Sequence, residues 1–133
     1  MSFEYRDLRP YKYQLTEEFR LKIDLARFPT TIAVPNEYLC FMGHDLVISS
    51  GYAWDGPSGP AIDTKTFMRG SLVHDALYQL LRLEAVKLSD LHEARKYADE
   101  LLVELCRQDG MNRFRAWYVY WVVRYFGWQF SQR

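Results

Sequence analysis

Within the first fifty residues, a stretch of the chain alternates between apolar and polar positions, with the period of two that is typical of β-strands. The alternation is clearest from Tyr11 to Leu25 and is interrupted at residues 16–18, where we expect a turn between two strands. Further short strands are expected at 31–35, 37–42 and 45–48, the last two joined around Gly43. These segments predict a small antiparallel sheet, with residues 1–10 as a loose lead-in before it.

After residue 64 the apolar spacing changes to the three-and-four pattern of amphipathic helices. It predicts three helices, at about 65–82, 90–107 and 112–130. Asp90 and Glu93 are spaced like a capping box at the start of the second helix, and Gly110 is expected to end that helix.

Residues 51–64 separate the two patterns. Two glycines, two prolines and a serine lie between Asp55 and Pro60, a composition that leaves room for a loop only. We therefore predict an α+β fold in a single domain of 133 residues, which is long enough to bury a core. Its parts are a β-rich segment at 1–50, the Gly/Pro-rich loop at 51–64 and a three-helix unit at 65–133.

The third predicted helix carries aromatic side chains on nearly every side, which is typical of a helix that is central or lies against something apolar. We expect these side chains to lie in the core. The alternative is a membrane-facing stripe of Trp117, Trp121 and Trp128, with Arg124 on the same stripe.

Charge and composition restrict the partners. Lys plus Arg and Asp plus Glu both number 17, so the net charge of zero predicts no nucleic-acid partner. The N-terminus does not resemble a secretory signal, and the longest apolar run, Ala116 to Val123, is shorter than the roughly 20 residues of a membrane-spanning helix. We expect synthesis in the cytoplasm, with a place in a virion or release at lysis left open. The oligomeric state is not specified by the sequence.

The cysteines and the remaining histidines give only weak candidates for a disulfide or a metal site. One bridge between Cys40 and Cys106 is possible, without a wider disulfide framework. Cys40 and His44 make a poor zinc site, because no second ligand pair accompanies them. His44-Asp45 is a second His-Asp pair and suggests an HD-type metal phosphohydrolase, but those enzymes are all-helical and this pair lies in a β segment.

The helix that follows the loop holds the strongest candidate chemistry. Residues four apart share a helix face, so His74 and Tyr78 stack along one side, and Gly70 one turn earlier leaves room beside the ring. Asp99 lies at the border of the apolar stripe on the second helix, and it can reach His74 if the two helices pack antiparallel. A carboxylate on one ring nitrogen makes the other nitrogen a better base.

The loop itself predicts a calcium site. Backbone carbonyls at Trp54, Gly56 and Ser58, with the carboxylate of Asp75, would form the oxygen-only ligand set that calcium prefers. Calcium there could polarise an ester carbonyl and hold a phosphate while His74 activates water.

Residues 51–57 followed by His74-Asp75-x-x-Tyr78 resemble the calcium loop and catalytic helix of phospholipase A2. The likeness is closest to the short, cysteine-poor forms in parvovirus capsids and to small bacterial and fungal enzymes. It implies that His74 is the general base and Asp75 a calcium ligand. Tyr78 and the later Asp99 would be the supporting hydrogen-bond partners.

The same stretch also resembles a family of uncharacterised phage and prophage proteins. Its core is a GYxWDGxS loop, the segment LVHDALYQL and a helix with an Ala-Asp pair, and the match runs from about Leu46 to Trp128. This second resemblance is the closer one and implies no established activity. Ser58 also departs from phospholipase A2, because it stands where that loop has its last glycine.

Two functions follow from these observations. The first is a calcium-dependent hydrolase of phospholipid acyl esters, of phage origin, that works at a membrane surface. The second is a non-catalytic phage or prophage protein that binds a virion or host protein with the same scaffold.

Each site residue also has a purely structural interpretation. His74 and Asp75 could simply tie the loop to the helix, with Tyr78 packed beside them. The acid on the second helix could be a rim residue paired with Arg95 or Arg82.

Overall fold

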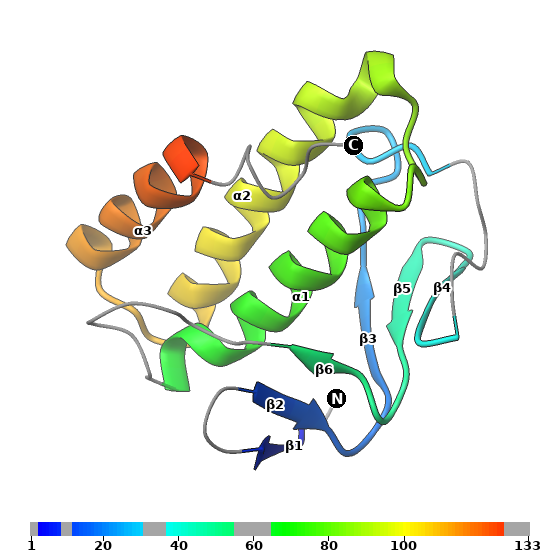
Figure 1. Ribbon diagram of the computed structural model, residues 1–133. Coiled ribbons are helices and arrows are strands. Elements are labelled where there is room, and N and C mark those ends of the chain that lie inside the picture. The colour runs from blue at the N-terminus through cyan, green and yellow to red at the C-terminus, as the bar shows by residue number, and fades with distance from the viewer. Residues whose placement is uncertain (1–2, 9–11, 31–36, 55–64, 127–133) are drawn as a thin grey trace.

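The computed structural model describes residues 3–8, 12–30, 37–54 and 65–126, and shows two small antiparallel sheets beside three helices (Figure 1). This confirms the predicted α+β class. The first sheet has the order β1-β2-β6, formed by Tyr5–Leu8, Lys12–Leu15 and Ala53–Trp54. The second has the order β3-β5-β4, formed by Phe19–Lys22, Asp45–Ile48 and Leu39–Met42.

The strands predicted within 11–25, 37–42 and 45–48 were right in place and wrong in pairing. The predicted loop at 51–64 was wrong for residues 53 and 54, which form β6 and pair with β2. The β4–β5 hairpin turns at Gly43, whose φ of 63° suits glycine, as expected. The strands on either side of residues 16–18, however, pair with different partners, so two sheets form instead of one. The predicted strand at 31–35 lies outside the described residues.

Part of the predicted lead-in is a strand. Residues 5–8 form β1 because Tyr5 has apolar partners on the neighbouring strands. Its ring lies 5.6 Å from that of Tyr13 and 5.9 Å from that of Trp54, measured between centroids. The expectation of a loose segment was therefore wrong for these residues.

The helices are α1 (Lys65–Arg82), α2 (Leu91–Gln108) and α3 (Arg113–Phe126), with a short 3₁₀ turn at Leu88–Asp90. The spacing of apolar residues thus predicted all three. Gly110, with a φ of 102°, follows the end of α2 as expected. The predicted capping box was wrong, because the Asp90 side chain makes no capping hydrogen bond.

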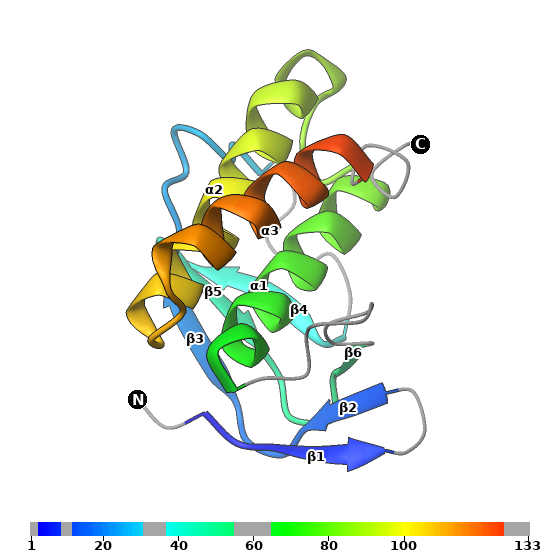
Figure 2. The ribbon, with the colours of Figure 1, turned by 90° about the vertical axis from the view of Figure 1, so that its left-hand side faces the viewer.

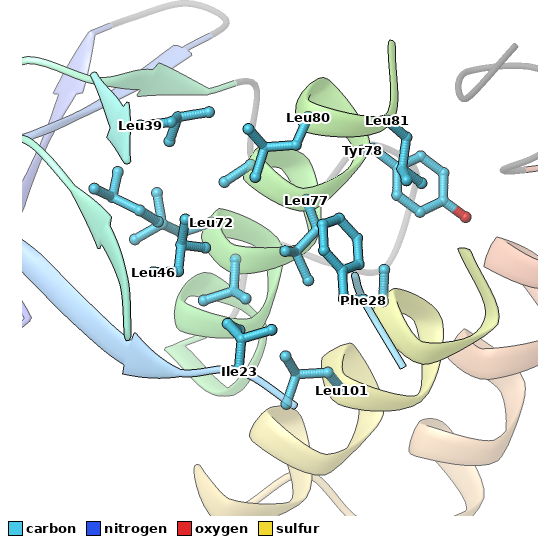
Figure 3. Packing of buried hydrophobic residues seen from close by; sticks show 14 of the residues in the cluster. Ile23, Phe28, Leu39, Leu46, Leu72, Leu77, Tyr78, Leu80, Leu81 and Leu101 are labelled. Carbon is cyan, nitrogen blue, oxygen red and sulfur yellow. The ribbon is translucent and has the colours of Figure 1, made fainter. Parts of the chain in front are cut away.

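Helix α1 is the central element of the described fold, between α2 and the second sheet (Figures 1 and 3). Figure 3 shows side chains of α1 facing those of the strands across a shared core. The labelled residues of this core are Ile23, Phe28, Leu39, Leu46, Leu72, Leu77, Tyr78, Leu80, Leu81 and Leu101.

Gly70 brings α1 and α2 into close contact. A Cβ atom at Gly70 would lie 2.9 Å from Cδ1 of Leu102 and 3.1 Å from Sγ of Cys106. The space that we assigned to the His74 ring is therefore filled by α2. Since both helices approach there, Gly70 contributes to the site by setting the distance between them.

The aromatic residues of α3 were expected in the core, and that prediction was wrong for most of those described. The side that packs against the rest of the fold carries the small or branched residues Ala116 and Val119, both buried. The outer side exposes five aromatic residues, Phe114, Trp117, Tyr118, Trp121 and Tyr125. Trp128 lies outside the described residues.

Two further expectations concern cysteines and membranes. Cys40 and Cys106 are both free, so the possible bridge between them does not form. Burial raises the pKa of the Cys106 thiol to about 12.

Among the helices of the described segments, none combines the length and apolar composition that crossing a membrane requires.

Candidate functional site

A buried carboxylate connects all three helices. Asp99 of α2 is 0% exposed, and we call it and its four partners the Asp99 cluster. Its Oδ1 lies 2.7 Å from Nε2 of His74 and accepts a hydrogen bond of 2.6 Å from the hydroxyl of Tyr78. Its Oδ2 accepts a hydrogen bond of 2.8 Å from Nη1 of Arg124 and lies 3.8 Å from Nη1 of Arg95.

The helix geometry explains how these groups meet. His74 and Tyr78 are one turn apart on α1, with ring centroids 4.2 Å apart, as the spacing predicted. Helix α2 runs antiparallel to α1, because Arg69 pairs with Asp109 at 3.0 Å and the later His74 pairs with the earlier Asp99. The expected contact between histidine and acid is confirmed.

Charge on Asp99 is stabilised despite its burial. Burial alone would raise the pKa of the Asp99 carboxyl, but the hydrogen bonds and charges of its partners, His74 first, lower this pKa by more. The pKa of Asp99 therefore lies below its ordinary value. Burial, followed by the nearby negative charge, raises the pKa of the Tyr78 hydroxyl, which stays a neutral donor.

The cluster fixes the proton on the histidine ring. A carboxylate only accepts hydrogen bonds, so Nε2 of His74 must carry the proton that faces Asp99. In the neutral ring, Nδ1 then holds a lone pair. The side chain of His74 keeps 12% exposure, so the ring lies at the edge of the buried cluster. This arrangement is suited to taking a proton from a water molecule.

The predicted calcium ligands are only partly described. Trp54 lies in β6, and its indole Nε1 donates a hydrogen bond of 3.0 Å to Oγ of Ser71, one turn before Asp75 on α1. The Trp54 side chain thus contacts α1 one turn before the half-buried Asp75. Gly56 and Ser58 lie outside the described residues. Calcium therefore stays a prediction, with Asp75 as its charged ligand.

The residues that the structure describes form no cluster of side chains for a metal ion. Over the described ranges, no three or more His, Cys, Asp and Glu residues gather in a way that could hold a metal ion. A site made chiefly of backbone carbonyls is of a different kind and needs only one carboxylate.

Arg124 is the member of the cluster that sequence reasoning did not assign. The structural interpretation of the sequence placed Asp99 at the rim, paired with Arg95 or Arg82. The rim position was wrong, because the acid is fully buried, and Arg124 supplies the closest cation. One signal could have found it, because Arg124 is the single charged residue between Ala116 and Phe126.

A groove on the described surface lies apart from the Asp99 cluster. A groove of about 620 Å³ runs between the segment after β3 and α2, and its polar lining includes Lys22, Asp24, His44 and Glu104. His44, of the second His-Asp pair, is exposed there and lies apart from the Asp99 cluster.

Acid should remove the stabilising effect of the Asp99 charge. We compare the wild type with Asp99→Asn, which keeps the shape and carries no charge. Because the folded-state pKa of Asp99 is below its ordinary value, its stabilisation is complete above the unfolded-state pKa of about 3.9 and is lost as the pH falls through the folded-state pKa. The stability gap between the two proteins, measured by urea denaturation, should therefore be widest near neutral pH and close in acid. A gap that is constant with pH would contradict an ionised Asp99.

Comparisons with protein-family models, with curated proteins and with solved structures find no match to this chain. A function is therefore inferred from the contacts of His74 and its partners.

Proposed function

We propose that the protein is a hydrolase of phospholipid acyl esters in which His74 activates a water molecule. The observation that carries this proposal is the 2.7 Å contact between Nε2 of His74 and a fully buried Asp99 carboxylate. A histidine held in this way has a fixed orientation and a fixed tautomer, which are the two requirements for a general base at a defined position.

The proposed reaction uses both ring nitrogens of His74. Nδ1 takes a proton from water while the water oxygen attacks the ester carbonyl carbon, and the resulting imidazolium is stabilised by the negative charge of Asp99. The ring then returns the proton to the departing alcohol, which gives a free fatty acid and a lysophospholipid. Tyr78 and Arg124 keep the carboxylate in place through their hydrogen bonds.

Calcium is part of the proposal. When bound, it would supply positive charge to the ester carbonyl oxygen and to the phosphate. Asp75 would hold it, together with the backbone carbonyls of the loop.

Fatty-acid release from mixed phospholipid vesicles tests this proposal. We expect release in calcium, little release in chelator, and a loss of about 100-fold or more in His74→Ala, which removes the base. His92→Ala is the matched control, because His92 is an exposed histidine in the first turn of α2, and this variant should match the wild type. Release that persists in His74→Ala, or no release from folded wild type, would refute the assignment.

A second candidate is a non-catalytic phage or prophage protein that binds a virion or host protein. It is favoured by the contact between Arg124 and Asp99, because a carboxylate held from three helices can serve as a structural tie alone. The vesicle experiment separates the two candidates, since a folded protein that releases no fatty acid under either condition supports the second.

A further inference from the structure

Helix α3 presents an unusually apolar outer surface. We define the aromatic face of α3 as Phe114, Trp117, Tyr118, Trp121 and Tyr125, with exposed fractions of 76%, 60%, 55%, 55% and 73%. In Figure 2 this helix crosses the side of the molecule that faces the viewer, in front of α1 and α2. Large exposed apolar patches usually mark an interaction surface.

Arginines border the aromatic face on both sides. Successive helical residues turn by about 100°, which places Arg113 and Arg124 along one edge of the face and Arg115 along the other. Residues 113–126 contain no acidic residue. Arg113 is exposed, whereas Arg124 turns inward to the Asp99 cluster. The helix therefore combines an apolar centre with edges that carry no acidic residue, and Arg113 is the exposed cation on them.

We propose that the aromatic face of α3 docks on an anionic phospholipid surface. Trp and Tyr have an apolar body and a polar tip, which fits the boundary between headgroups and acyl chains. Positive edges complement the negative charge of such headgroups, and an amphipathic helix of this kind lies in the plane of the interface. The inference deepens the proposed function, on which it rests for the choice of lipid as partner.

Direct binding tests the surface without hydrolysis. Vesicles of ether-linked phosphatidylglycerol contain no acyl ester, and chelator removes calcium, so flotation with these vesicles measures docking alone. The wild type should bind them at least tenfold more strongly than vesicles of ether-linked phosphatidylcholine. Trp117→Ser/Trp121→Ser should lose tenfold or more of this binding, and Arg113→Glu should lose part of it and become less sensitive to salt.

Met42→Ser is the matched control. Met42 is 54% exposed and is the last residue of β4. Figure 1 shows this strand on the opposite side of the molecule from α3, so the substitution should leave binding unchanged. Circular dichroism checks that every variant is folded.

The outcomes separate this inference from the proposed function. Docking on ether-linked vesicles supports the surface even if ester lipids release no fatty acid, in which case the hydrolase proposal alone fails. The inference would be overturned if the wild-type protein does not bind anionic vesicles. It would also be overturned if the Trp117→Ser/Trp121→Ser variant binds them as strongly as the wild type. A dimer in sedimentation that the same variant dissociates, without vesicle binding, would also overturn it and assign the face to a second copy.

Discussion

Replacing Asp99 by alanine should lower the free energy of unfolding by about 3–5 kcal/mol, since breaking a buried ion pair leaves an uncompensated charge inside the protein. Arg124 and Arg95 would lose their counter-charge, and the Tyr78 hydroxyl would lose its acceptor. Urea denaturation at neutral pH measures the change, with circular dichroism as the signal.

Two further variants make this result specific. Glu104→Ala removes an exposed acid from the same helix and should change stability by no more than about 0.5 kcal/mol. A double-mutant cycle of Asp99→Ala with Arg124→Ala should show coupling, because these two residues are in contact. A loss close to that of Glu104→Ala would contradict the buried position of Asp99.

Leu77→Ala should cost about 2–5 kcal/mol, because a large side chain would leave a cavity in a packed core. Leu77 is 0% exposed, and Figure 3 places it beside Phe28 at the junction between α1, α2 and the strands. Neighbouring residues on several elements would keep this cavity open, so its collapse would recover little of the lost stability. Thermal unfolding followed by circular dichroism measures the shift in midpoint.

The control for this cavity is Leu88→Ala. Leu88 is 72% exposed, so the same chemical change should alter the midpoint very little. Equal shifts for both variants would argue against the packing around Leu77.

The helices could be predicted because their apolar spacing is set by one-sided burial. The bounds predicted for α1 match the structure, and the shared face of His74 and Tyr78 follows from the same periodicity. Strand pairing could not be predicted in this way. A period of two indicates that a strand exists but does not name its partner, so β2 and β3 were joined in one sheet although each pairs elsewhere.

The site was predicted where it depends on α1 and α2, and missed where it depends on α3. Asp99 lies on a helix with a clear apolar stripe, which allowed its approach to His74 to be foreseen. Helix α3 has aromatic residues around most of its circumference, so its sequence does not reveal which side packs inward. A lone charge in an apolar stretch marks Arg124 as unusual, but its contact with Asp99 depends on which side packs inward, and the structure provides that side.

The single carboxylate of Asp99 also has a consequence for cooperativity. Local opening of α3 would withdraw Arg124 and leave the acid buried with less compensating charge. The partly open state therefore has a raised free energy, because the charge of Asp99 stays buried. In the fully unfolded state, water solvates both Asp99 and Arg124. Helix α3 is peripheral in position, yet the raised free energy of the partly open state joins it to α1 and α2 in one unit that opens and closes together.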